Sequence, residues 1–218
     1  MQGKKWVYLD KEHDRNQIKS TAERLNLSPF IVTLLYNRGI TSDKEITSFL
    51  TKSLRDVHSP LLLPDIEKAT ERIYSAVEKS EKICIYGDYD VDGITSTVLL
   101  YKYLLSHGAD VSDYIPDRIS EGYGINIKAI NKISKTGCKL LITVDCGITA
   151  VGETELAKAQ GMDVIITDHH TCKEKLPDAV AVINPKRPDN EYPFSQLAGV
   201  GVIFKTVLAL SMKFGEDK

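Results

Sequence analysis

The sequence has 218 residues, of which 42% are hydrophobic and 27% charged, and its net charge at pH 7 is −2. This composition is typical of a globular protein and excludes a disordered chain. The charge excludes a chain that binds nucleic acid through overall basicity, and no apolar run is long enough to predict a membrane span. The four cysteines show no C-x-x-C spacing, so we expect reduced thiols in a cytoplasmic protein rather than a zinc site.

Short helices are predicted at the start of the chain. Helical patterns cover residues 17–25 and 28–37, and Ser28 followed by Pro29 is a typical helix start. A third helix is predicted to begin at Thr41–Ser42–Asp43. Two prolines in Leu61–Pro64 mark a linker. We therefore expect a small helical region over residues 1–63 and a separate domain over residues 64–218.

Strands and helices alternate in the second region. Strands are predicted over residues 83–86, 111–115, 139–144, 163–167 and 180–183, and helices over residues 65–79, 94–106, 126–134, 150–160 and 198–212. Alternation of this kind is typical of a parallel sheet with helices on both faces. The sequence therefore predicts an α/β fold of Rossmann-like type, preceded by the small helical region.

The most informative stretch is Lys82–Gly93, KICIYGDYDVDG. A buried strand is followed by Asp88, Asp90 and Asp92 and then by a helical pattern, which predicts a loop at the carboxyl end of a strand, where α/β proteins bind ligands. Three carboxylates this close repel one another unless a cation neutralises them. Oxygen ligands suit Mg²⁺ or Mn²⁺. The alternative is a solvated acidic turn in which one aspartate caps the helix.

Two further predicted strands also end in polar residues. Asp145 follows one of them, and Asp168, His169 and His170 follow the next. Because the carboxyl ends of parallel strands meet at one edge of a sheet, we expect these carboxylates and histidines to share a crevice with those of the first motif. Two cations bridged by a carboxylate in such a crevice form a common arrangement for hydrolysing phosphate esters. The alternative is a set of helix caps and core histidines.

These motifs resemble those of the DHH phosphoesterase superfamily, which is named for Asp-His-His. The matching segments are YGDYDVDG (Tyr86–Gly93), IPDRISEGYG (Ile115–Gly124), VDCGI (Val144–Ile148), DHH (Asp168–His170) and YPFSQLAGVG (Tyr192–Gly201). Within the superfamily the chain is similar to the single-stranded-DNA-specific exonucleases of bacteria, and this resemblance covers nearly all of residues 20–210. One motif alone has low specificity, whereas the combination is highly specific.

The resemblance implies roles for individual residues. The metal ligands implied by position are Asp90, Asp92, Asp145 and His169. Among these, Asp145 is implied to be the carboxylate that bridges two cations, and Asp88 is either a further ligand or an orienting group. Asp168 is implied to orient the ligand His169 from outside the coordination sphere. His170 is implied to face the scissile phosphate as a hydrogen-bond donor or acid.

A phosphate-facing loop is implied at Arg118 and Gly122–Tyr123–Gly124. An arginine makes bidentate contacts to phosphate, and glycines let the backbone approach closely. Glu121 is expected to hold the loop in place. The alternative is an ordinary surface loop without a ligand.

The resemblance implies a Mn²⁺- or Mg²⁺-dependent 5′→3′ exonuclease that hydrolyses single-stranded DNA in repair and recombination. The implied partners are a single-stranded-DNA-binding protein and a helicase, and no membrane is implied. Family members carry another metal-binding aspartate and a second domain after the helix that here ends near Met212, so we expect residues 1–218 alone to have weak or no nuclease activity. Two alternatives stay open: a small-molecule phosphodiesterase or pyrophosphatase, and a catalytically incomplete binding fragment.

Overall fold

The computed structural model describes residues 13–51, 53, 56–122 and 124–216. Contacts divide the chain into two compact units, Met1–Val57 and His58–Lys218, and each is described by itself. The division lies before the predicted boundary at residue 63 because the short 3₁₀ helix η2 (Pro60–Leu62) packs on the last helix of the second unit.

The described part of the first unit contains the three predicted helices. These are α1 (Arg15–Leu25), α2 (Pro29–Asn37) and α3 (Asp43–Leu50). Ser28 caps α2 by accepting a hydrogen bond from the backbone N of Ile31 at 3.2 Å, with Pro29 in the first turn. Ser42 and Glu45 form a reciprocal capping box at α3. The helices pack around a small apolar core that includes Val32 and Ile46.

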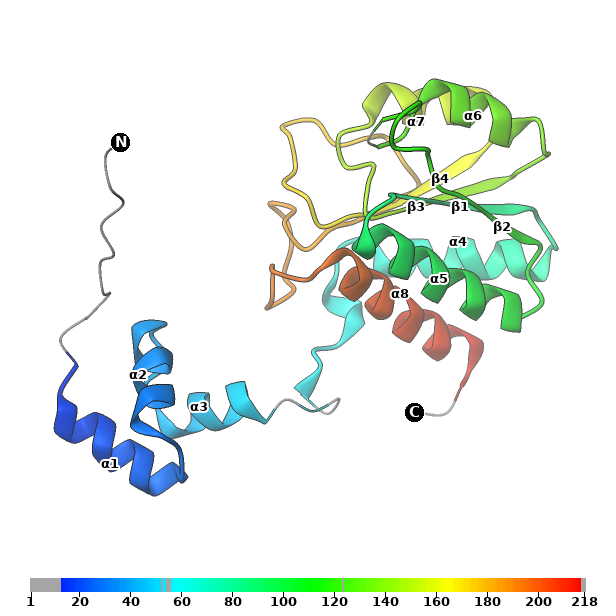
Figure 1. Ribbon diagram of the computed structural model, residues 1–218. Helices are drawn as coiled ribbons and strands as arrows, with labels where there is room; N and C mark the ends of the chain where they lie inside the picture. The colour runs from blue at the N-terminus through cyan, green and yellow to red at the C-terminus, as the bar shows by residue number, and fades with distance from the viewer. Residues whose placement is uncertain (1–12, 52, 54–55, 123, 217–218) are drawn as a thin grey trace, which may run out of the picture. The chain divides into compact units, whose positions relative to one another are not determined.

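The second unit is built on a five-stranded parallel sheet in the order β2-β1-β3-β4-β5 (Figure 1). Its strands are β1 (Ile83–Gly87), β2 (Val111–Tyr114), β3 (Leu140–Val144), β4 (Asp163–Thr167) and β5 (Ala181–Ile183). This confirms the predicted α/β fold. Every residue of β1 and β3 is buried, as expected of central strands that helices cover on both faces.

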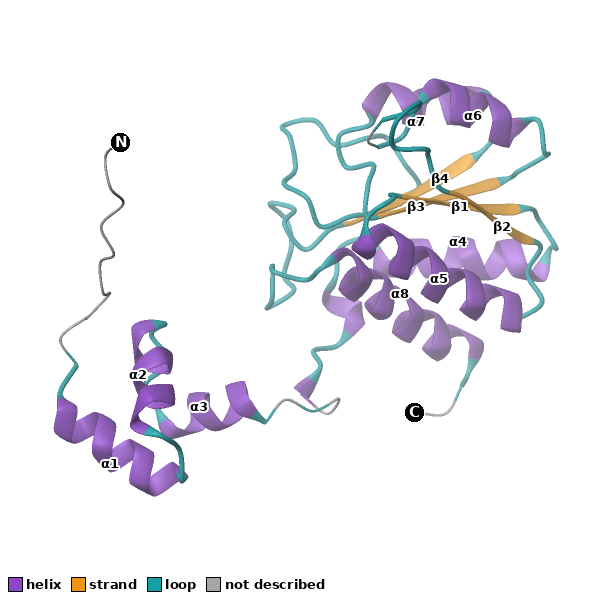
Figure 2. Ribbon diagram, in the orientation of Figure 1, coloured by secondary structure: helices purple, strands orange, loops and turns teal. Residues whose placement is uncertain are grey.

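Helices cover both faces of the sheet (Figure 2). Helices α4 (Ile66–Glu78), α5 (Val91–Ser106) and α8 (Gly199–Phe214) lie on one face, and α6 (Ile127–Ser134) and α7 (Val151–Ala159) lie on the other. Successive strand residues point to opposite faces, so Ile85 packs under the first layer and Tyr86 under the second. Among the described residues, no helix is long and apolar enough to cross a membrane.

Helix α5 begins three residues earlier than the sequence pattern predicts. Asp90 is its N-cap and accepts a hydrogen bond from the backbone N of Gly93 at 3.0 Å. Asp92 and Gly93 therefore lie in the first helical turn rather than on a loop. A Cβ atom at Gly93 would lie 2.3 Å from the carbonyl oxygen of Asp88, so only glycine allows the turn to pack this closely on the strand end.

Candidate metal centre

Strand register aligns three aspartates at the carboxyl edge of the sheet. Gly87 pairs with Val144, and Val144 pairs with Thr167. The next residue on each of these strands is an aspartate, namely Asp88, Asp145 and Asp168. Each of the three is only 1% exposed to solvent. Burial of three neighbouring carboxyl groups is costly unless protons, hydrogen bonds or cations compensate them.

Within the described part of the chain, Asp145 has no hydrogen bond that compensates its burial. Neither of its carboxylate oxygens has a hydrogen-bond partner among the described residues, although Nε2 of His169 lies 3.1 Å from Oδ1. Its backbone is left-handed, with φ of 61°, which is a sparsely populated conformation for a residue other than glycine. Burial, with the nearby charges of Asp90 and Asp92, raises the pKa of Asp145 to about 8. A bound cation would supply the missing partner.

Two groups of donor atoms converge at Asp145. The first comprises Asp88, Asp90 and Asp145, and the second comprises Asp145, His169 and His170; within each group the donor atoms lie within 4.8 Å of one another. Carboxylate oxygens suit Mg²⁺ and Mn²⁺, and neither group contains a thiolate, the ligand that selects soft metals. One carboxylate shared by two groups is the arrangement that a bridged pair of cations requires. The residues therefore fit the implied metals.

Asp88 offers a second buried acceptor to the first group. Its Oδ1 accepts a hydrogen bond from the backbone N of Tyr89 at 2.8 Å, whereas Oδ2 has no partner among the described residues. Burial and the charge of Asp90 raise the pKa of Asp88. The unpartnered oxygen favours a ligand role for this residue, which the sequence left open between ligand and orienting group.

Asp92 has a different position from the other carboxylates of its motif. It belongs to neither donor group of the described residues, and its Oδ1 accepts a hydrogen bond from the backbone N of Val200 at 3.4 Å. Val200 lies in the first turn of α8, whose N-cap residue Ala198 makes no side-chain cap. A carboxylate at this helix N-terminus is favourably placed. Asp92 thus connects α5 to α8 in this structure, while its charge also acts on Asp145, and its role as a metal ligand stays a prediction.

Asp168 orients the ring of His170. Its Oδ1 accepts hydrogen bonds from Nδ1 of His170 at 2.7 Å and from the backbone N of His169 and of His170, and Oδ2 accepts from the backbone N of Ile148. Burial raises the pKa of Asp168, but the bonds from His170 and the backbone outweigh it and leave the pKa below its ordinary value. The bond to Asp168 in turn raises the pKa of His170.

This arrangement differs from the role implied by the family resemblance, in which Asp168 orients His169. Asp168 contacts His169 through its backbone N–H, while the ring of His169 turns toward Asp145. The ring that Asp168 fixes is that of His170, because the turn after β4 brings Nδ1 of His170 back onto the carboxylate. The sequence could not distinguish the two adjacent histidines.

The predicted phosphate-facing loop lies beside the acidic motif. The guanidinium of Arg118 sits over the ring of Tyr89, 5.3 Å from its centroid, and Tyr89 separates Asp88 from Asp90 in the chain. A cation stacked on this ring is well placed next to a bound anion.

Hydrogen bonds to Glu121 hold the rest of that loop in place. Glu121 accepts hydrogen bonds from the Tyr114 hydroxyl at 2.6 Å and from the backbone N of Asp117 at 2.9 Å, as the sequence predicted. Gly122 and Gly124 both have φ of 80°, which glycine adopts without strain. Tyr123, the fourth predicted residue of the loop, lies outside the described residues.

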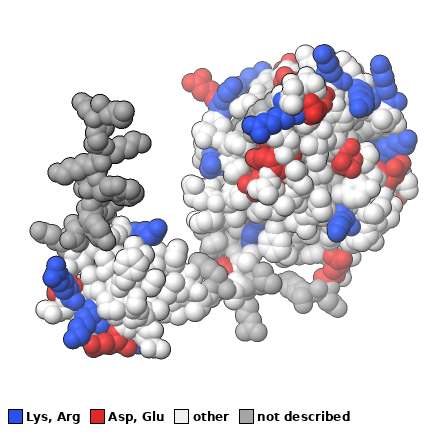
Figure 3. Space-filling model, in the orientation of Figure 1, with Lys and Arg blue, Asp and Glu red and all other residues white. Residues whose placement is uncertain are grey.

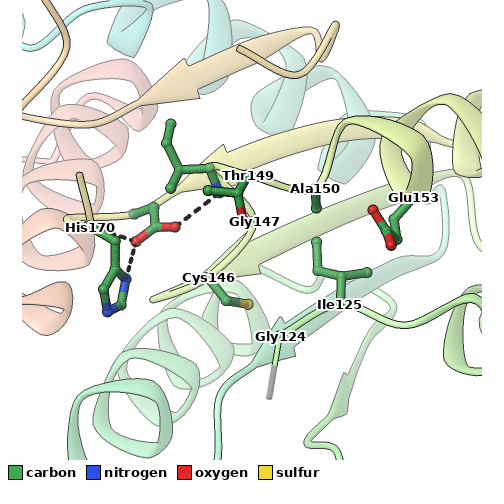
Figure 4. Close-up of a pocket in the computed structure, with 10 residues that line it drawn as sticks. Gly124, Ile125, Cys146, Gly147, Thr149, Ala150, Glu153 and His170 are labelled. Atoms are coloured by element: carbon green, nitrogen blue, oxygen red, sulfur yellow. Dashed lines mark hydrogen bonds and ion pairs between the residues drawn. The ribbon is translucent and has the colours of Figure 1, made fainter. Parts of the chain in front are cut away.

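A pocket of about 280 Å³ adjoins His170 (Figure 4). Its walls include Gly124 from the predicted loop and the segment from Cys146 to Ala150, with Ile125 and Glu153 at the end away from His170. The sequence did not predict Ile125, Thr149, Ala150 or Glu153, because they flank the polar motifs without a pattern of their own. Figure 3 shows basic and acidic side chains interspersed over the visible face of the second unit.

The fold and the converging donors define an α/β protein with a candidate divalent-cation centre at the carboxyl edge of a parallel sheet. The chain belongs to the DHH family: the model of its N-terminal domain matches residues 82–218. The curated single-stranded-DNA-specific exonuclease RecJ of Bacillus subtilis is 45% identical over 90% of this chain, and RecJ of Escherichia coli is 37% identical over 90%. The chain spans 25% and 34% of the length of these two relatives.

Solved structures give the same family. A structure titled as Thermus thermophilus RecJ in complex with Mn²⁺ is similar with a TM-score of 0.72 and 27% identity, covering 94% of this chain and 28% of that one. A second, titled as exonuclease RecJ bound to manganese, has a TM-score of 0.67 and 34% identity, covering 74% of this chain and 41% of that one. The resemblance read from the sequence motifs is thus confirmed.

Proposed function

We propose that this chain is the metal-binding core of a phosphodiesterase that removes nucleotides from the 5′ end of single-stranded DNA. The observation that carries the proposal is the buried carboxylate of Asp145, whose oxygens accept no hydrogen bond from the described residues and on which two donor groups converge. The names of the relatives, which are RecJ exonucleases, support the choice of substrate. The titles of the similar structures support Mn²⁺ or Mg²⁺ as the cation.

The chain's own residues have distinct roles in this proposal. Asp88, Asp90, Asp145 and His169 would hold the cations, which when bound stabilise negative charge on a phosphate under attack. His170 presents its ring beside this centre, and Asp168 fixes that ring through Nδ1 and favours its protonated form. A protonated imidazole can donate a hydrogen bond or a proton to a phosphate oxygen. Arg118 adds positive charge beside the acidic motif, where it sits over the ring of Tyr89.

The 218 residues alone are expected to hydrolyse DNA slowly, because most of the length of the relatives is not matched by this chain, and positioning of the strand supplies much of the barrier reduction in phosphoryl chemistry. A single-stranded-DNA-binding protein and a helicase are proposed partners, and the cytoplasm is the proposed location.

A direct test uses a 5′-labelled single strand with Mn²⁺, with a cyclic dinucleotide and pyrophosphate as alternative substrates. The chain is assayed alone and joined to the unmatched part of the Bacillus subtilis relative. We expect labelled mononucleotide from the joined protein, much less from the chain alone, and none from either protein with Asp145→Asn. Faster hydrolysis of a small substrate would favour the small-molecule alternative, and no hydrolysis of any substrate by the joined protein would favour a binding role without catalysis.

A further inference from the structure

We propose that the pocket beside His170 receives the nucleoside of the terminal nucleotide while its phosphodiester lies at the carboxylates. This inference rests on the proposed function. It adds which part of the substrate the pocket contacts and which part the candidate metal centre contacts. Six of its ten lining residues belong to the sequence motifs, namely Gly124, Cys146, Gly147, Ile148, Asp168 and His170, but of the converging donors only His170 lines it.

The position of His170 connects the pocket to the candidate metal centre. Its ring nitrogen converges with donors of Asp145 and His169, and the same side chain forms one wall of the pocket. Figure 4 shows the pocket extending from His170 past Cys146 and Gly147 toward Ile125 and Glu153. A ligand in the pocket that carries a phosphate at the His170 end would therefore present that phosphate to the donors.

The chemistry of the walls favours an uncharged ligand group. Ile125, which is partly exposed, offers apolar surface, with much smaller areas from Cys146 and Ile148, which are each 2% exposed; apolar surface suits the faces of a nucleobase. Among the described residues that line the pocket, none is Lys or Arg; the buried carboxylate of Asp168 is hydrogen-bonded to His170, and the carboxylate of Glu153 lies at the end away from His170. A carboxylate without a cation repels phosphate but accepts hydrogen bonds from the N–H and hydroxyl groups of a nucleoside.

The size of the pocket sets a limit on the ligand. Its volume of about 280 Å³ lies at the lower end of the range for ligand pockets, which is roughly 300–1,000 Å³. It accommodates one nucleoside rather than several. A pocket that holds one terminal nucleoside next to the hydrolytic centre would make cleavage proceed from a strand end, one nucleotide at a time.

The test measures binding, so it does not depend on the rate of hydrolysis. Calorimetry with Mg²⁺ at saturation compares the 3′-phosphate isomer of dCMP with 2-deoxyribose 3-phosphate, which has the same phosphate and sugar but no base, because the phosphodiester that joins a 5′-terminal nucleotide to the strand is on its 3′ side. The variant is Thr149→Trp, because Thr149 lines the pocket yet is exposed, so a large ring can narrow the pocket without entering the core. The matched control is Thr136→Trp, an exposed threonine that does not line this pocket.

We expect wild-type protein to bind the 3′-phosphate isomer of dCMP at least about tenfold more tightly than the sugar phosphate. Thr149→Trp should remove this difference while Mg²⁺ and sugar-phosphate binding stay unchanged, and Thr136→Trp should preserve it. Equal affinities in wild type, or a preference that survives Thr149→Trp, would overturn the pocket assignment and leave the proposed function intact. Failure of both compounds to bind the Mg²⁺-loaded protein would overturn both proposals.

Discussion

A Cβ atom on Gly199 would lie 2.2 Å from Oδ1 of Asp145, closer than any real contact allows. Gly199 begins α8, so the start of this helix forms one wall around the carboxylate on which both donor groups converge. Gly199→Ala should force the carboxylate or the helix to move. We expect Mn²⁺ affinity, measured by calorimetry, to fall about 10–100-fold, as when a residue that supports a metal ligand is replaced.

The same helix provides a control for this substitution. A Cβ atom on Gly201 would have its nearest neighbour, a carbon of Leu197, at 3.4 Å, which is an ordinary contact. Gly201→Ala carries the same change in helix propensity and should leave Mn²⁺ affinity within about twofold of wild type. Equal affinity losses in the two variants would show that α8 acts through general stability and not through the position of Asp145.

Replacement of Asp145 should separate stability from metal binding. In Asp145→Asn the buried group no longer carries a charge, and asparagine tolerates the left-handed backbone at this position. We expect the free energy of unfolding of the metal-free variant, measured at pH 8 by urea denaturation, to exceed that of metal-free wild type by about 1–3 kcal/mol. The variant should also lose Mn²⁺ binding. Asp113→Asn, an exposed change on β2, is the control and should alter neither quantity.

The raised pKa of Asp145 predicts a proton release on metal binding. Its carboxyl group has a pKa of about 8 when folded and about 3.9 when unfolded. The unfolded chain therefore binds fewer protons between these values, so the stability of the metal-free protein should fall as pH rises from 4 to 8.

Mn²⁺ competes with this proton, so its affinity should rise up to about pH 8 and then level off. Calorimetry at pH 7 in buffers of different ionisation enthalpy should detect close to one proton released per Asp145 site. No buffer dependence would contradict the assignment of Asp145 as a ligand.

Asp168→Asn should change the titration of His170. The variant removes the negative partner of Nδ1, so the pKa of His170 should decrease, as followed by NMR with the other histidine signals as reference. The hydrogen bond between protonated His170 and Asp168 contributes fully to the free energy of unfolding below about pH 6.5, the pKa of an unfolded histidine. This contribution is lost as pH rises through the raised pKa that His170 has in the folded protein. The free energy of unfolding of wild type should show this loss, and that of Asp168→Asn should not. An unchanged His170 titration would show that the bond has no effect on its charge.

The strand-end aspartates could be predicted from sequence because parallel register does most of the positioning. Asp88, Asp145 and Asp168 each follow a buried run whose length sets where the strand ends. The position of Asp92 was harder to predict, because it depends on Asp90 capping α5 one turn earlier than the apolar pattern indicates. The contact of Gly199 with Asp145 could not be predicted, because it joins segments that are far apart in the chain. The pocket could not be predicted either, because most of it is formed by loops, whose conformations a periodic sequence pattern does not indicate.

The central claim is that the strand-end donors bind divalent cations around Asp145. The most direct measurement is an anomalous difference map, at the manganese absorption edge, from crystals of this chain soaked in Mn²⁺. We predict a peak in contact with the carboxylates of Asp145 and Asp88, with His169 beside the same centre, and no peak there in crystals of Asp145→Asn. Manganese bound only elsewhere on the protein, or an unchanged peak in the variant, would contradict the account.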